Sequence, residues 1–267
     1  MKMTRIAALA VVSLIALISM VGSLLPGFDY RLQDREHFSE GPSYEHWLGT
    51  DAVGRDRLAR LVHGARVSFL LAPAAAGLSV FLAFVMGAAP GFAGGVTERI
   101  AKSMIDLALS LPWFFLLLMV RAVLPLNTSP GASAAITFFM LGLLGWGVPA
   151  RILLARAKRL MQSEFVLLAR ASGVSQRRLF CVHVLPNLLP VMIAQFWIAV
   201  PVLILAEANL SLLGLGVAEP LPSLGSLLKD LESVLSVRSD LSNLAPLLVL
   251  VAMVSSMQIA FAKREVS

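Results

Sequence analysis

The chain has 267 residues, of which 58% are hydrophobic and only 14% are charged, and its mean hydropathy is +0.82. Soluble domains are about half apolar and about a quarter charged, so this composition excludes an ordinary soluble domain and indicates a membrane protein. The formal net charge is +6, and the chain's one cysteine, Cys181, excludes an internal disulfide.

Six apolar stretches are long enough to cross a bilayer, for which a helix needs about 20 residues. The first, residues 6–28, exceeds the core of about 7–15 residues in a signal peptide and has no clear A-x-A site after it, so we expect an uncleaved anchor. Four more stretches carry no charge: residues 67–97, 132–150, 184–206 and 243–262. The sixth, residues 103–125, contains Asp106 near one end and Arg121 near the other. The sequence therefore predicts an all-α, polytopic membrane protein with six transmembrane helices.

Positive charges predict the orientation of these spans, since cytoplasmic loops carry an excess of lysine and arginine. Lys2 and Arg5 begin the chain and Lys263 and Arg264 follow the last span, so we expect both termini in the cytoplasm. The connection 151–183 would share that side, and Glu164 is its one acid against seven cations: Arg151, Arg156, Lys158, Arg159, Arg170, Arg177 and Arg178. Membrane orientation thus accounts for the positive net charge, and a nucleic-acid partner is not expected.

The segment after the first span is mixed in charge and includes "HWLGTDAVGRDRLARLVHGARVS" at residues 46–68. Thr50 or Asp51 is suited to cap a helix here. Its apolar side would hold Leu58, Leu61, Val62 and Ala65, and its basic side would hold Arg55, Arg57, Arg60 and Arg66. Such a pattern is typical of a helix that lies at the membrane surface.

A basic stretch, "EFVLLARASGVSQRRLFCVHVLPN" at residues 164–187, separates two apolar spans. It predicts a helix over Glu164–Ser172 that ends at Gly173, because glycine adopts the left-handed conformation of a helix end at no steric cost. Ser175 would cap a second helix, which Pro186 would close before the next span. Side chains available for burial are Phe165, Leu168, Leu179 and Phe180. From these residues alone, the stretch is either an element that docks onto a protein or an amphipathic linker on anionic lipid headgroups.

A third stretch, "LAEANLSLLGLGVAEPLPSLG" at residues 205–225, is apolar but interrupted. Gly214, Gly216, Pro220 and Pro222 oppose one continuous helix. Irregular backbone at membrane depth is tolerated only where protein or a water-filled cavity covers it. The stretch therefore favours a re-entrant or lip-like element on the outer side, with a plain apolar outer loop as the alternative.

These three stretches resemble motifs of ABC-importer permeases. "FVLLARASGVSQRRLFCVHVLPN" is similar to the EAA loop, in which a short coupling helix docks into the cytoplasmic ATPase; Ala169, Gly173, Leu185 and Pro186 match, while Leu167 and Leu168 replace the first two motif letters. Residues 46–68 and 205–225 resemble segments of the dipeptide, oligopeptide and nickel branch, as do Asp106 and Pro112, although Leu224 replaces a usual tryptophan. The chain's end lacks the branch's G-D-x-L-R-D motif, so the resemblance covers about residues 46–262.

The resemblance implies a type I ABC importer permease fold. Residues 1–66 would form an N-terminal anchor with an outer interfacial segment, and residues 67–262 would form the permease domain with its cytoplasmic coupling loop at residues 151–186. The residues it implies for ATPase coupling are Phe165, Leu168, Ala169, Arg170, Ala171, Gly173, Val174, Ser175, Arg177, Arg178, Leu185 and Pro186. The residues it implies for an outer-side gate or lip are Glu207, Gly214, Gly216, Pro220 and Pro222.

The resemblance also implies the partners and the location. It implies the bacterial inner membrane, a heterodimer with a second homologous permease subunit, two cytoplasmic ABC ATPase subunits and a periplasmic or lipid-anchored substrate-binding protein. No cofactor is expected on this chain, because no G-x-x-x-x-G-K-[ST] loop occurs in it; ATP and Mg would be bound by the ATPases. Histidines 37, 46, 63 and 183 show no metal-binding spacing, and no G-x-S-x-G motif occurs, so we expect neither a metal site nor an enzyme.

Three functions remain open at this point. The first is the pore subunit of an ATP-driven importer, most readily of di- or oligopeptides, with nickel or another small solute as the alternative substrate. The second is a secondary transporter driven by an ion gradient, which would be expected to show inverted repeats or midplane ionisable groups. No convincing repeat is visible, and the charges gather at the ends of the spans. The third is a membrane enzyme or scaffold.

Overall fold

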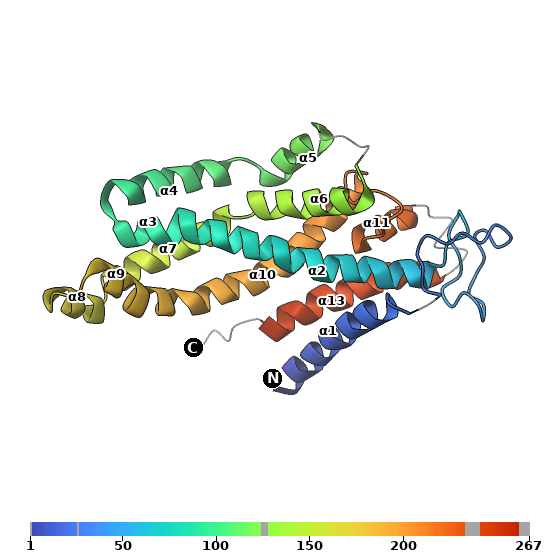
Figure 1. The fold of residues 1–267 in the computed structure, drawn as a ribbon, viewed down its shortest axis with the longest axis horizontal. Helices are drawn as coiled ribbons and strands as arrows, with labels where there is room; N and C mark the ends of the chain where they lie inside the picture. The colour runs from blue at the N-terminus through green and yellow to red at the C-terminus, as the bar shows by residue number, and fades with distance from the viewer. Residues whose placement is uncertain (1, 26, 124–127, 233–240, 262–267) are drawn as a thin grey trace. The chain divides into compact units, whose positions relative to one another are not determined.

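The computed structural model describes residues 2–25, 27–123, 128–232 and 241–261, and within them the regular elements are helical (Figure 1). The α-helices are α1 (Lys2–Gly22), α2 (Arg57–Ala83), α3 (Ala89–Ala93), α4 (Gly95–Ser110), α5 (Trp113–Val123), α6 (Pro130–Leu144), α7 (Gly147–Met161), α8 (Glu164–Ala171), α9 (Gln176–Arg178), α10 (Leu185–Leu212), α11 (Leu224–Leu228) and α13 (Ala245–Phe261). Two π-helical turns, η1 (Phe84–Ala88) and η2 (Leu179–Val184), and two 3-10 turns, η3 (Lys229–Glu232) and η4 (Leu241–Leu244), join them.

Five helical runs in the described part of the chain are long and apolar enough to cross a membrane: Met3–Gly22, Arg57–Ala93, Pro130–Met161, Gln176–Leu212 and Ser242–Phe261. The pair Gly95–Ser110 and Trp113–Met119 would be a sixth, bent by 72°. The break has a simple cause. Leu111 precedes Pro112, and its ψ of 133° is the extended conformation that a residue before proline prefers. The six predicted stretches therefore correspond to five continuous spans and one broken one.

Two of the spans contain a π turn directly before a proline. Ala89 donates its backbone N–H to the Phe84 carbonyl, five residues back, and Pro90 follows. Leu185 donates in the same way to the Phe180 carbonyl, and Pro186 follows. The wider turn shifts the backbone ahead of the proline, whose ring and missing N–H fit poorly inside a regular α-helix, and the helix continues. The prediction that Pro186 closes a helix is therefore wrong, because helix runs on from Gln176 through Leu212.

The chain divides into two compact units. Unit 1 contains residues 1–73, 120–138 and 201–267, and unit 2 contains residues 74–119 and 139–200. In unit 1, helices α1 and α13 pack against each other, and the Arg5 Nε donates to the Ala260 carbonyl at 2.6 Å. Helix α11 also packs against α13. The N-terminal helix and the C-terminal part of the chain thus belong to one packed body.

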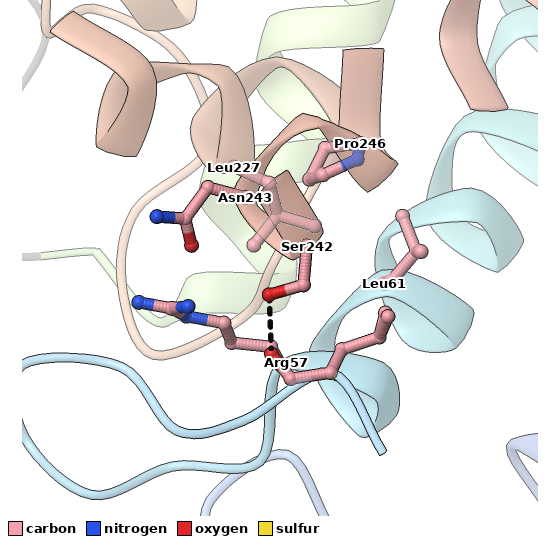
Figure 2. A pocket seen from close by; sticks show the side chains of 7 residues that line it. Arg57, Leu61, Leu227, Ser242, Asn243 and Pro246 are labelled. Carbon is pink, nitrogen blue, oxygen red and sulfur yellow. Dashed lines mark hydrogen bonds between the residues drawn. The ribbon is translucent and has the colours of Figure 1, made fainter. Parts of the chain in front are cut away.

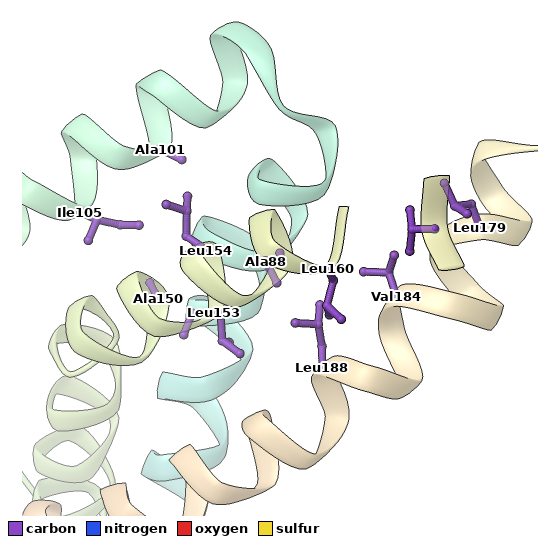
Figure 3. Close-up of a cluster of buried hydrophobic side chains, with 13 residues drawn as sticks. Ala88, Ala101, Ile105, Ala150, Leu153, Leu154, Leu160, Leu179, Val184 and Leu188 are labelled. Carbon is purple, nitrogen blue, oxygen red and sulfur yellow. The ribbon is translucent and has the colours of Figure 1, made fainter. Parts of the chain in front are cut away.

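Unit 2 is built around α7, against which η1, α3 and α4 pack. Figure 3 shows the buried side chains of this core, including Ala150, Leu153 and Leu154 from α7. Gly87 and Gly91 form a G-x-x-x-G pattern where η1 and α3 meet α7, and a Cβ on Gly91 would lie 2.9 Å from the Leu154 carbonyl oxygen. Small residues allow helix backbones to approach closely inside a membrane. The packing of unit 2 therefore depends on these two glycines.

Candidate functional site

The basic segment, residues 164–187, forms a helix, a tight turn and the start of a second helix. At the end of α8, the Val174 N–H donates to the Ala169 carbonyl and the Gly173 N–H donates to the Arg170 carbonyl, the paired bonds of a Schellman motif. Gly173 has a φ of +77°, which glycine adopts without strain. Ser175 precedes α9 in an extended conformation, as a capping residue does, although its side chain makes no capping hydrogen bond.

Two side chains fasten the basic segment to unit 2. Val166 and Leu179 are fully buried in the same core, where Leu179 lies with Val184 and Leu188 (Figure 3). Phe180 is partly buried, and its ring meets the Phe92 ring edge-on with centroids 4.9 Å apart. The segment is therefore held from one side by apolar packing.

The opposite side of the basic segment is apolar and exposed. Phe165, Leu167 and Leu168 are 43%, 50% and 68% exposed. Val166 occupies the core, so Phe165 and Leu168 remain available for burial against a partner, as predicted for them. Arg170, Ala171, Arg177 and Arg178 are also exposed. The segment thus presents leucines and arginines together on a fixed support.

Two acids of α4 form ion pairs with cations of the 151–183 connection. Arg151 pairs with Asp106, and the Lys158 Nζ lies 2.7 Å from the Glu98 Oε1. Asp106 and Arg151 remain about half exposed. Counting charges along the connection alone missed these acids, since they precede it by many residues in the sequence.

Residues 213–223, which we call the outer segment after the side predicted for them, follow the end of α10 without regular helix. Gly214 has a φ of +75°, and a Cβ on Gly216 would collide with Ser211. Pro220 and Pro222 lie further along this irregular stretch, which ends where α11 begins with a capping box between Ser223 and Ser226. The sequence pattern indicated this interruption correctly.

Glu207 joins the end of α10 to the start of α11. Its side chain is fully buried, and the Oε1 accepts hydrogen bonds from the Ser211 and Ser223 hydroxyls, both at 2.7 Å. Burying a polar group costs free energy unless it finds such partners. Glu207 therefore holds the two ends of the outer segment together.

The Arg121 side chain binds backbone carbonyls in the middle of the outer segment. This arginine is 4% exposed and donates from Nε to the Leu215 carbonyl at 3.0 Å and from Nη2 to the Gly216 carbonyl at 3.0 Å. The same Nη2 donates to the Ser133 Oγ at 2.7 Å, and that oxygen also accepts the Ala218 N–H. Arg121 is thus a structural anchor of the segment, a role that its position near the end of a span did not reveal.

An ion-pair network fixes Glu219, at the tip of the outer segment, to residues before α2. Arg60 pairs with Asp51 and, at 2.8 Å, with Glu219; Arg55 pairs with both acids at 2.7 Å. The Arg60 side chain is only 3% exposed. The predicted surface helix with arginines on one face is therefore wrong, since Arg60 is buried inside a charged network at the start of a span.

The cap of α2 also differs from the prediction. Asp56, and neither Thr50 nor Asp51, accepts the Ala59 N–H at 2.7 Å, directly before the first helical residue. Asp51 instead accepts hydrogen bonds from the backbone of its own loop and pairs with Arg55 and Arg60. Its burial favours the neutral acid, but hydrogen bonds from the Arg55 backbone and side chain outweigh this and leave the pKa of Asp51 below its ordinary value.

Unit 1 contains a small pocket and a larger one of about 240 Å³, which Glu45, Trp47 and Asp56 help to line. One pocket of about 30 Å³ lies among Arg57, Leu61, Leu227 and Asn243 (Figure 2), where the Ser242 Oγ donates to the Leu48 carbonyl at 3.1 Å. That volume suits a water molecule and not a peptide. In the part of the chain that the structure describes, no three His, Cys, Asp or Glu side chains gather as metal ligands would.

Long apolar helices, a broken span and a basic helical segment between spans define a polytopic membrane protein. Residues 79–263 match the family model "Binding-protein-dependent transport system inner membrane component", and this chain belongs to that family. The matched region includes both the basic segment and the outer segment. It confirms the resemblance to ABC-importer permeases and their type I fold.

Named relatives agree with the family. A peptide permease protein of Brucella suis is 36% identical over 195 residues, which are 73% of this chain and 63% of that protein. The oligopeptide transport system permease protein OppC of Mycobacterium bovis is 35% identical over 83% of this chain and 76% of its own length. OppC of Haemophilus influenzae is 35% identical over 84% and 71%. The chain therefore spans less than two thirds of the Brucella relative that it matches.

Proposed function

We propose that this chain is a transmembrane pore subunit of an ATP-driven importer of di- or oligopeptides. The observation that carries the proposal is the basic segment, which is fixed to unit 2 by Val166 and Leu179 yet exposes Leu167, Leu168 and Phe165 beside arginines. Exposed apolar side chains of this kind outside the spans favour a protein partner. The peptide substrate is suggested by the names of the relatives. Nickel or another small solute is the alternative.

The partners in this proposal are two cytoplasmic ABC ATPases, a second homologous permease subunit and a periplasmic or lipid-anchored substrate-binding protein. ATP and Mg belong to the ATPases. The basic segment, including Ala169, Gly173, Leu185 and Pro186, would contact an ATPase, so the 151–186 connection and both termini would lie in the cytoplasm. Residues 1–66 would form the anchor and the outer part that follows it, and residues 67–262 the permease domain.

Motion would pass through the basic segment because it is mechanically tied to the spans. When ATP closes the ATPase pair, the two coupling helices would approach each other and the spans would move from inward-open to outward-open. The loaded binding protein would favour the same change from outside, since a ligand shifts an equilibrium only through its different affinity for the two states. The outer segment, with Glu207, Gly214, Gly216, Pro220 and Pro222, would serve as the gate or lip on that side.

The ATPase contact can be tested by co-purification of the chain with its ATPase subunits in detergent. Leu168→Ser removes the most exposed leucine of the basic segment, and Leu213→Ser is the matched control, because Leu213 is 58% exposed on the outer segment. We expect the ATPase to be lost with Leu168→Ser and retained with Leu213→Ser. Equal retention by the two variants would refute docking at the basic segment.

A further inference from the structure

A pocket of about 390 Å³ in unit 2 lies beside the surface proposed to meet the ATPase, and Leu167 and Arg170 belong to both. Its walls come from the turn between α3 and α4, the end of α7 and the middle of α8. Phe92, Met161 and Leu167 supply an apolar side, and Glu98, Lys158 and Arg170 supply the charges. An apolar wall beside two cations is suited to a ligand that has an anionic part and a hydrocarbon part.

The side chains that line the pocket carry two positive charges and one negative charge, a net charge of +1. Lys158 pairs with Glu98 at 2.7 Å but keeps a side chain that is 52% exposed. Arg170 is exposed, and its guanidinium makes no ion pair or hydrogen bond within the residues described. Two cations and one acid therefore match a ligand with a single negative charge, such as a phosphodiester.

The pocket lies at the ends of membrane spans. The chain leaves the span 57–93 and enters α4 at Gly94 and Gly95, whose φ angles of +69° and +62° let it reverse direction. The facing wall is the end of the span 130–161. A turn between two spans lies outside the hydrocarbon core, on the side of the phospholipid headgroups of that leaflet.

The walls of the pocket are rigid. A Cβ on Gly91 would lie 3.0 Å from the Ala157 Cβ, so α3 rests directly on α7. Phe92 is held by its edge-on contact with the Phe180 ring. A rigid pocket is ready to accept a ligand without the cost of ordering its walls.

We propose that this pocket binds the headgroup of an anionic phospholipid. The phosphodiester lies between Lys158 and Arg170, and the glycerol and the first acyl carbons lie against Phe92, Met161 and Leu167. A free phosphate would use the cations but gain nothing from the apolar wall, and a zwitterionic lipid would bring its own cation to a positive site.

Native mass spectrometry of the purified full-length chain in detergent tests this site. Phosphatidylglycerol and phosphatidylcholine are titrated separately, and inorganic phosphate is added as a competitor. A cation near a lipid surface contributes a factor of about fivefold to binding. We expect about fivefold weaker phosphatidylglycerol binding for Arg170→Gln, about 25-fold for Arg170→Gln with Lys158→Gln, and no change for Arg177→Gln, which removes an exposed cation that does not line the pocket.

A gain of binding completes the test. Glu98→Gln removes the acid that neutralises Lys158, and we expect it to tighten phosphatidylglycerol binding by about fivefold, an effect that misfolding cannot imitate. Equal binding of phosphatidylcholine, an equal loss with Arg177→Gln, or displacement of the lipid by millimolar phosphate would overturn the proposal. In the last case the pocket would be a site for small anions.

Discussion

The approach of α7 to η1 gives a sharp prediction, because it depends on a missing methyl group. In Gly87→Ala, the new Cβ would lie 2.9 Å from the Ala150 carbonyl carbon and 3.0 Å from its Cα, besides colliding with its carbonyl oxygen. Ordinary contacts of a Cβ are 3.4–4 Å, so clearing the carbonyl oxygen requires one helix to move by about an ångström. The neighbouring atoms are backbone and cannot rotate away.

Overpacking of this kind costs about 1–3 kcal/mol. For a chain of this size, that corresponds to a fall of roughly 2–12 °C in the unfolding temperature. The control is Gly77→Ala in α2, where a Cβ would meet nothing within 4 Å. There alanine should be neutral or stabilise by up to about 1 kcal/mol, because glycine inside a helix is unfavourable. Thermal unfolding in detergent measures both variants, and an unchanged unfolding temperature for Gly87→Ala would refute the close packing.

Three further predictions concern the charged network and the turn of the basic segment. Asp51→Asn should destabilise the chain by about 1–3 kcal/mol, because it removes one charged partner of the buried Arg60 and leaves Glu219 as the other. Asp34→Asn, on an exposed loop, should have a smaller effect, and thermal unfolding compares the two variants. Folding lowers the pKa of Asp51 from 3.8, so the stability that its carboxylate contributes is present above that pH and is lost as the pH falls through the lower folded pKa. The difference in unfolding temperature between wild type and Asp51→Asn should therefore shrink under acid titration. A difference that stays constant with pH would contradict this. Gly173→Val should reduce uptake per ATP hydrolysed, because valine is strained at a φ of +77°. Gly131→Val, at a glycine without positive φ, should leave that ratio unchanged. A normal ratio in Gly173→Val would count against the role of the turn.

The sequence predicted those features that depend on apolar length or on one residue's conformation. The spans follow from uninterrupted apolar residues, and the end of α8 follows from Gly173, since few other residues accept its φ. The break at Pro112 was not predicted, although the restriction on Leu111 before it is a local signal. Pro186 misled the prediction because the π turn before it is set by packing as well as by sequence.

The buried face of α8 shows where a sequence pattern stops being informative. Residues 165–168 are four apolar residues in a row, so helical periodicity fits Phe165 with Leu168 as well as Val166 with Ala169. The core of unit 2 selects Val166. The pairing of Arg60 with Glu219 was equally hidden, because the two residues are 159 positions apart and nothing local links them.

Reconstitution into liposomes shows whether another subunit drives this pore. Peptide uptake is measured for the purified chain alone under a proton or sodium gradient, and for the chain with its partner permease, ATPases and binding protein in the presence of ATP. We expect accumulation only in the second case, and only while ATP is hydrolysed. Gradient-driven uptake by the chain alone would contradict the account and identify a secondary transporter.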